Sequence, residues 1–118
     1  MIEPIDGLDA DVVGMRVTGT FSVEDYVGSI EPEVDRLEEA GDLRLLLHLG
    51  PEFDGFGDGA WGELTDELRR MKFDRGAVVT DDIAIRTGLA LLRWTLHGQV
   101  RSFGNDDYER AVAWVTAR

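Results

Sequence analysis

The sequence predicts an α/β domain built on a mixed, mostly parallel five-stranded sheet with flanking helices. A hairpin-like start, two later strands that are apolar on both faces, and amphipathic segments between the strands give the order ββαβαβαβα. Parallel strands need a crossover connection of helical length, whereas a hairpin needs only a turn. We therefore expect residues 1–118 to form one domain whose first strand is an antiparallel edge.

The first two strands are predicted from alternation. The segment 2–8 is short and partly apolar. The segment 12–20 has Val13, Met15 and Val17 on one face and small or polar residues on the other. A period of two indicates a half-buried strand, and the polar turn between the two segments favours a hairpin.

The first helix is predicted to begin after Ser22, its N-cap, and to end before Gly41, the C′ residue just beyond its C-terminus. Pro32 lies inside this helix and removes one backbone donor. Because the apolar stripe stays in phase across the proline, we expect one helix with a kink near Gly28 rather than two helices.

The rest of the chain alternates strands and helices. We predict strands at 43–49, 76–80 and 99–103, and helices at 60–72, from Ile83 to about Leu96, and after Asn105. The segment 50–59 is too rich in glycine to be helix or strand. Asp58 is expected to cap the helix that follows, and Asp81 and Asp82 to occupy the cap and first turn of the next. Asn105 is expected to cap the last helix.

Composition excludes several classes of function. With 24 acidic and 12 basic residues the formal net charge is −12, which opposes binding to nucleic acid or to anionic lipid. Cysteine is absent, so disulfides and thiolate chemistry are excluded. We see neither a signal peptide nor an apolar run of membrane-spanning length, and we expect a cytoplasmic protein. No motif calls for a cofactor or a metal, since the paired aspartates lack the ligand density of a calcium loop.

Several segments together, rather than any single one, resemble a known family. They are Gly7-Leu8 with 13–17, 22–26, 45–47 running into 53–56, 77–81, and 98–103. In their order and spacing the chain resembles the STAS-like domains grouped with SpoIIAA, the sporulation anti-sigma-factor antagonist. That family is also compared with the CRAL-TRIO lipid-binding domains.

The resemblance implies a phosphorylatable serine or threonine at the start of the helix after the third strand. The matching segment, 51–63, contains neither residue, and Thr65 lies a turn inside the helix. Asp54 or Asp58 would imitate a phosphate poorly, because a short carboxylate reproduces neither its charge nor its geometry.

A candidate binding site lies where the loops diverge beyond the carboxyl ends of parallel strands. Phe53 and Phe56 stand among glycines and are followed by Trp61. One interpretation is a lid over an apolar pocket between the second and third helices, as the CRAL-TRIO likeness implies. The other is that these rings fold back as ordinary core.

The segment from Ile83 to Gly104 contains no acidic residue. Arg86, Arg93 and His97 are spaced by seven and four, which predicts one basic face on the third helix. Together with Asp81 in the preceding loop, Arg86 and Arg93 are candidate ligand contacts for an acidic head group. The alternatives are pairing with a second subunit and ordinary intramolecular ion pairs.

Catalysis is not expected. His48 lies in a predicted strand, and His97 is explained by the dipole at a helix end. Neither belongs to a nucleophile-elbow, phosphate-loop or metal-binding pattern.

Two functions remain open. One is a non-catalytic domain that binds an apolar or amphiphilic small molecule. The other is a protein-interaction module of the antagonist type, with a regulatory protein as partner. We also expect a symmetric homodimer, the commonest closed assembly.

Overall fold

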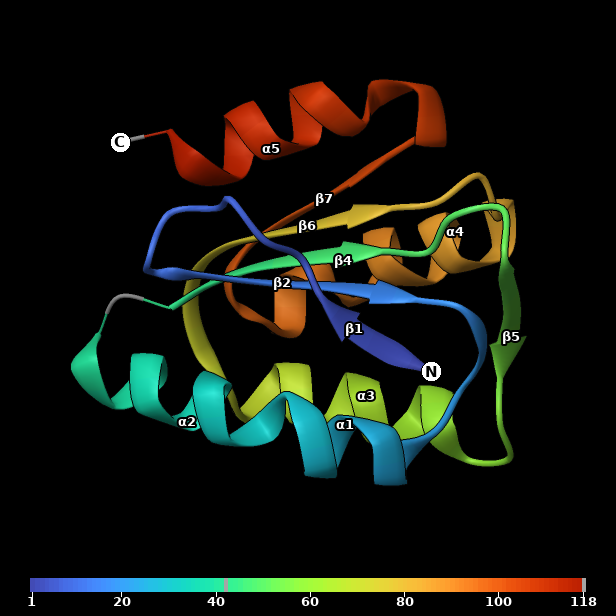
Figure 1. Cartoon of the computed structure of the whole chain (residues 1–118), viewed down its shortest axis with the longest axis horizontal. Coiled ribbons are helices and arrows are strands. Elements are labelled where there is room, and N and C mark those ends of the chain that lie inside the picture. Colours follow the sequence, from blue (N-terminus) through green and yellow to red (C-terminus); the bar gives the residue numbers. More distant parts are fainter. Residues whose placement is uncertain (42, 118) are drawn as a thin grey trace.

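The computed structural model describes residues 1–41 and 43–117 and places a five-stranded sheet between two helical layers (Figure 1). The strands, in sheet order, are β1 (Ile2–Pro4), β2 (Val12–Val17), β4 (Arg44–His48), β6 (Lys72–Val79) and β7 (His97–Phe103). β1 is antiparallel to β2, and every other neighbouring pair in this sheet is parallel. The predicted mixed sheet with an antiparallel edge is confirmed.

The helices divide unequally between the two faces of the sheet. They are α1 (Val23–Ser29), α2 (Glu31–Ala40), α3 (Ala60–Arg70), α4 (Ile83–Leu92) and α5 (Tyr108–Thr116), with short 3-10 turns at η1 (Arg93–Thr95) and η2 (Asn105–Asp107). Buried side chains of α1 to α4 share one core cluster, and those of α5 belong to a second. Figure 1 shows α5 alone above the sheet and α1, α2 and α3 below it.

The apolar run of β4 explains why both faces are covered. Leu45 and Leu47 belong to the cluster under α1 to α4, whereas Leu46 belongs to the cluster under α5. Successive side chains of a strand point to opposite faces, so an apolar residue at every position is stable only when both faces are buried.

The helix predicted for residues 22–41 is in fact two helices, so the expectation of one bent helix is wrong. Ser22 caps α1 as predicted, because its Oγ accepts a hydrogen bond from the Asp25 backbone N–H at 3.2 Å. The helical hydrogen-bond pattern is interrupted at Ile30, which lies between α1 and α2, and Pro32 lies in the first turn of α2. Proline is tolerated there because the first N–H groups of a helix have no intrahelical acceptor.

A second, two-stranded sheet was not predicted. β3 (Gly19–Phe21) pairs in parallel with β5 (Phe53–Phe56), which lies in the segment expected to be irregular. The predicted strand 12–20 therefore ends at Val17, and Gly19, with φ of 69°, turns the chain out of the main sheet. β5 stands beyond the carboxyl ends of β4 and β6, at the right of Figure 1.

Other element ends also differ from the predictions. β1 stops at Pro4 rather than residue 8, because a turn follows it, and Ile5 and Leu8 instead pack against the α5-side cluster. α4 ends at Leu92, and β7 begins at His97, where it already pairs with β6.

Two of the three predicted aspartate or asparagine caps are wrong. Asp82 caps α4 as expected, with Oδ1 accepting from the backbone N–H groups of Ala84 and Ile85. Asp58 does not cap α3, because the chain enters that helix through Gly59 in the left-handed conformation. Asn105 begins the 3-10 turn η2 and makes no cap hydrogen bond to α5.

Candidate functional site

A cavity of about 50 Å³ lies between the main sheet and helices α3 and α4. The side chains that line it are almost all apolar. The main sheet and the ends of its strands contribute Met15, Leu45, Leu47, Leu49, Phe73, Val78 and Val100, and β5 contributes Phe56. Helix α3 contributes Trp61, Leu64 and Leu68, helix α4 contributes Ile85 and Leu89, and Tyr26 and Met71 also line the cavity. This position, between the second and third predicted helices, is where the sequence placed an apolar pocket.

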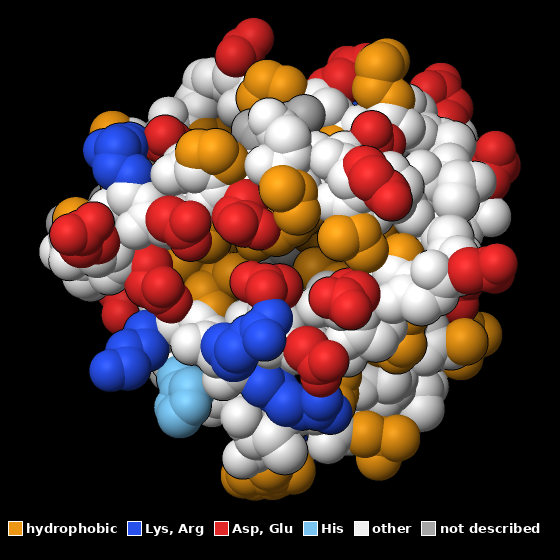
Figure 2. All heavy atoms as spheres, turned by 90° about the horizontal axis from the view of Figure 1, so that it is seen from below, with side chains coloured by type: hydrophobic (Ala, Val, Ile, Leu, Met, Phe, Trp, Pro, Cys, Tyr) orange, Lys and Arg blue, Asp and Glu red, His pale blue; other side chains and the backbone are white. Residues whose placement is uncertain are grey.

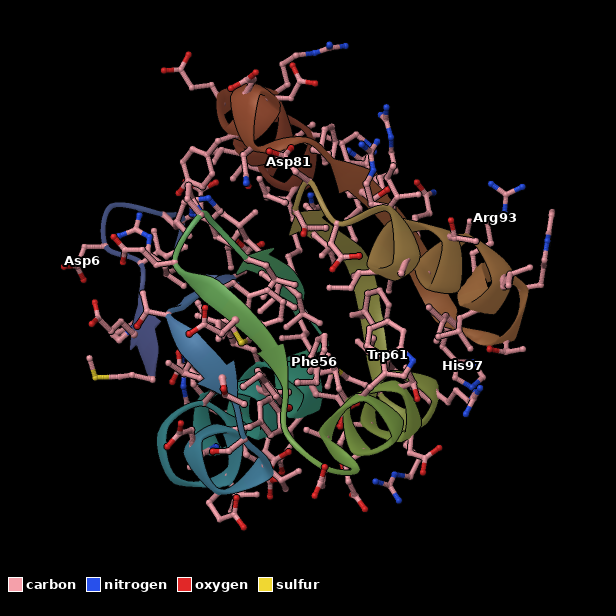
Figure 3. The ribbon with its side chains drawn as sticks, turned by 90° about the vertical axis from the view of Figure 1, so that its right-hand side faces the viewer. Asp6, Phe56, Trp61, Asp81, Arg93 and His97 are labelled. Atoms are coloured by element: carbon pink, nitrogen blue, oxygen red, sulfur yellow. The ribbon has the colours of Figure 1, made fainter. Side chains whose placement is uncertain are left out.

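The outer wall of this cavity is thin. Phe56, Trp61 and Leu64 line it and are each only half-buried, so these side chains separate the cavity from solvent. The rings of Phe56 and Trp61 meet edge to face, with centroids 5.1 Å apart, and Figure 3 shows them side by side. Gly88 of α4 faces the Trp61 ring without a side chain. We call Phe56, Trp61 and Leu64 the aromatic cover.

Phe53, the third predicted aromatic residue, supports the cover without lining the cavity. Its ring lies edge to face on Phe56, with centroids 5.3 Å apart. β5 positions both rings, because its pairing with β3 sets Phe56 opposite Phe21, whose ring is 5.3 Å away.

The three charged residues predicted for the same site lie elsewhere. Asp81 accepts hydrogen bonds from the backbone N–H of Asn105 at 2.8 Å and from its side-chain amide at 3.3 Å. Arg86 donates to Ser102 Oγ at 3.2 Å, and Arg93 lies over the Trp94 ring. None of the three lines the cavity, and Figure 3 shows Asp81 and Arg93 away from Trp61.

The basic face predicted on the third helix does not form as one helical stripe. Arg93 lies at the end of α4, and His97 is the first residue of β7, so the dipole explanation for His97 is also wrong. Among the described residues, Arg86, Arg93 and Arg101 form no ion pair with a carboxylate.

A second hollow lies between α1 and α3, and sequence reasoning missed it. It has a volume of about 70 Å³ and is lined by Phe21, Val23, Tyr26, Val27, Glu31, Glu63, Leu64 and Glu67. Figure 2 shows this side of the molecule hollowed near its centre, with apolar side chains at the floor, acidic side chains around it and Lys and Arg side chains along one edge. We call this hollow the acidic groove. The available signal was the spacing by four of Glu31 and Asp35, and of Glu63 and Glu67, on successive helices.

Tyr26 forms part of the wall of both the cavity and the acidic groove. Its side chain is 5% exposed, and its hydroxyl has no hydrogen-bond partner among the described residues. Burial raises the pKa of this hydroxyl well above its ordinary value, and the charges of Glu67, Glu31, Asp35 and Glu38 raise it further. The hydroxyl therefore stays protonated and faces a negative field.

The two histidines do not belong to the cavity or to the acidic groove. His48 Nδ1 accepts a hydrogen bond from Arg16 Nε at 3.5 Å, and the His48 ring lies 4.8 Å from that of Tyr108. Burial, followed by the charge of Arg16, lowers the pKa of His48. Neither His48 nor His97 lines the cavity or the acidic groove.

The segment that resembles a phosphorylation switch offers no accessible hydroxyl. Thr65 is 5% exposed, and its Oγ1 donates to the carbonyl of Gly62 at 3.0 Å. Asp54 and Asp58 are exposed.

The outer face of α4 is unusually apolar. Ile83, Leu91 and, in η1, Trp94 are 77%, 75% and 83% exposed. Large apolar side chains that are exposed together mark interaction surfaces in soluble proteins. No helix within residues 1–41 and 43–117 combines the length and apolar character needed to cross a bilayer.

Comparisons with known proteins agree with this architecture. A model of the SpoIIAA-like family matches residues 12–116. The structure is similar to a crystal structure of an uncharacterized protein of the DUF3478 family with a SpoIIAA-like fold, from Shewanella loihica. The two share 21% sequence identity with a TM-score of 0.65, over 98% of this chain and 92% of that one. No curated protein matches the sequence.

Proposed function

The chain belongs to the SpoIIAA-like family, and from that premise we propose that it is a non-catalytic domain that binds an apolar or amphiphilic small molecule. The supporting observation is the apolar cavity under α3 and α4, closed on its outer side by the half-buried aromatic cover. Binding sites for small molecules are concave and mostly apolar, with a few polar groups that orient the ligand.

Ligand entry requires the cover to move. The cavity of about 50 Å³ is well below the roughly 300 Å³ at the lower end of ordinary ligand sites. Trp61 is the side chain that we expect to give way, because it is half-buried and its ring faces Gly88, which has no side chain.

The composition of the wall favours binding over chemistry. Of the described side chains that line the cavity, Tyr26 alone is titratable, and its hydroxyl is held in the protonated form. General acid–base catalysis needs a group whose pKa lies near the working pH. Nucleophilic catalysis needs a nucleophile next to a base, and the wall supplies neither.

The test compares two truncations with and without ligand. Leu68 is buried in the wall, so Leu68→Ala is expected to cost about 2–5 kcal/mol of unfolding free energy. Trp61→Ala is expected to cost less, because one side of its ring faces free space rather than packed atoms. In thermal unfolding, medium-chain alkyl probes should raise the Tm of the wild type in proportion to the logarithm of their concentration.

The same probes should lose this effect on Trp61→Ala. If the wild type is indifferent to a broad panel of amphiphiles and Trp61→Ala is at least as destabilising as Leu68→Ala, the aromatic cover is ordinary core and the proposal fails.

A second candidate function is protein interaction, and the exposed face of α4 favours it. Ile83, Leu91 and Trp94 are large apolar side chains that are exposed along a segment without acidic residues. A symmetric homodimer through this face of α4 would bury them. Light scattering over a dilution series should then show a dimer for the wild type and a monomer for Trp94→Ser; a monomeric wild type at every concentration contradicts this candidate.

A further inference from the structure

We propose that the ligand of this domain carries a primary ammonium group, which the acidic groove holds while the apolar part occupies the cavity. This inference rests on the proposed function, because it assigns the head group of the same molecule. It replaces the acidic head group suggested by Arg86 and Arg93, neither of which lines the cavity or the groove.

The first support is the hydroxyl of Tyr26. A buried polar group without a hydrogen-bond partner costs free energy, so native structures keep few of them. Tyr26 is only 5% exposed, and its hydroxyl has no hydrogen-bond partner among the described residues. Tyr26 lines the acidic groove together with Glu31, Glu63 and Glu67, which places its side chain beside three carboxylates.

The second support is the excess of negative charge around that hydroxyl. The carboxylates of the acidic groove are Glu31 on α2 and Glu63 and Glu67 on α3. A separate hollow, which shares Glu67 with the groove, is lined by Asp35 and Glu38 and also by Arg70. Within the described chain, Glu67 pairs with Arg70, and Glu38 accepts from the backbone N–H of Lys72. Glu31, Asp35 and Glu63 form no ion pair there.

The chemistry of these groups selects one class of head group. An ammonium has three N–H donors and no acceptor, so it can donate to the Tyr26 oxygen and to a neighbouring carboxylate at once. A carboxylate or phosphate head group would be repelled by Glu31, Glu63 and Glu67. A neutral alcohol would satisfy Tyr26 but would gain nothing from the charges.

The geometry allows one molecule to reach both spaces. Tyr26 and Leu64 line the cavity on one side and the acidic groove on the other, so these two side chains separate the spaces. The groove volume of about 70 Å³ suits an ammonium with one or two methylene groups. Displacement of Leu64, a member of the cover, would join the two spaces.

Three probes that differ only in their head group test this assignment: n-octylamine, n-octanol and n-octanoate. Binding of each probe is measured by calorimetric titration at neutral pH. Salt at about 0.15 M screens the non-specific attraction between the amine and the acidic chain. The variants are Tyr26→Phe, which removes only the hydroxyl, and Glu67→Gln, which removes one charge of the groove. Glu109→Gln is the matched control, because it removes one exposed charge on α5, across the sheet.

We expect the wild type to bind octylamine at least about tenfold more tightly than octanol, and octanoate most weakly, since hydrogen bonds to charged groups contribute about that factor or more. Glu67→Gln should weaken octylamine by about tenfold and leave octanol unchanged. Tyr26→Phe should weaken octylamine by about tenfold and octanol less, because the alcohol loses only a neutral hydrogen bond. Glu109→Gln should change neither.

Equal binding of octylamine and octanol, or equal weakening by Glu109→Gln and Glu67→Gln, would overturn the ammonium site and leave apolar binding intact. Failure of all three probes to bind would overturn the proposed function together with this inference.

Discussion

Replacing Gly88 with alanine measures whether the Trp61 ring can move, on which ligand entry depends. A Cβ at Gly88 would lie 3.0 Å from Trp61 Cζ2 and 3.6 Å from Cη2. Carbon atoms pack best at about 3.5–4.0 Å, so the ring has to retreat by roughly 0.5 Å. The cavity of about 50 Å³ adjoins this ring and offers the space for such a shift.

The sign of the stability change follows from two opposing terms. Alanine in a helix interior is more favourable than glycine by about 0.8–1 kcal/mol. Forcing an extra methyl group into a rigid, well-packed site costs about 1–3 kcal/mol. If Trp61 moves at little cost, Gly88→Ala should stabilise the protein by roughly 0.5 kcal/mol; if the ring is fixed, the variant should be less stable by up to about 2 kcal/mol.

The change in unfolding free energy is measured by urea denaturation, monitored by far-ultraviolet circular dichroism, and is compared with two control variants. Gly62→Ala in α3 has no atom within 4 Å of the new Cβ, so it reports helix propensity alone. Gly98→Ala would place its Cβ 2.2 Å from the Phe73 carbonyl oxygen, and it should be strongly destabilising. Overpacking a rigid site costs about 1–3 kcal/mol. A Gly88→Ala variant that is less stable than the wild type by more than about 1 kcal/mol would therefore refute the idea of a movable cover.

Three further predictions concern stability. Arg44 is buried and donates to two carbonyl groups at the C-terminal end of α5, so Arg44→Met should cost about 3 kcal/mol, measured by urea unfolding, with hydrogen exchange rising first in α5. Asp82→Ala removes the cap of α4 and should lower the unfolding free energy by about 0.5–2 kcal/mol, whereas Asp82→Asn should restore most of it. His48 has a pKa below its ordinary 6.5 when folded, so the unfolded chain binds more protons and stability should fall as the pH drops through 6.5. His48→Gln should flatten that fall in denaturation curves taken between pH 5 and pH 7.5, and an unchanged slope would show that other groups cause it.

The five strands of the main sheet and the need for helices on both of its faces were determined by the sequence itself. The strand at Leu43 to Leu49 is apolar at almost every position, and such a run is stable only with both faces covered, whatever the details of packing. The caps at Ser22 and Asp82 were predictable for a similar reason, because a side-chain oxygen that satisfies N–H groups two or three residues away acts locally.

Contacts between distant segments were decided by the tertiary structure. The strand β5 exists because Gly19 turns the chain out of the main sheet to pair with Phe53, and no local pattern in a glycine-rich segment announces such a partner. The same pairing brings Phe56 to Trp61, so the two rings of the aromatic cover were predictable as residues, whereas their contact and the part played by Leu64 were not.

The charged part of the site shows the same division. Arg86 and Arg93 were placed on one helical face by counting residues, but α4 ended at Leu92 and the count no longer applied. The acidic groove unites α1 with α3, two helices about 40 residues apart. A sequence specifies helical faces through local spacing, whereas only packing decides which two faces meet and which buried hydroxyl, here that of Tyr26, is left between them.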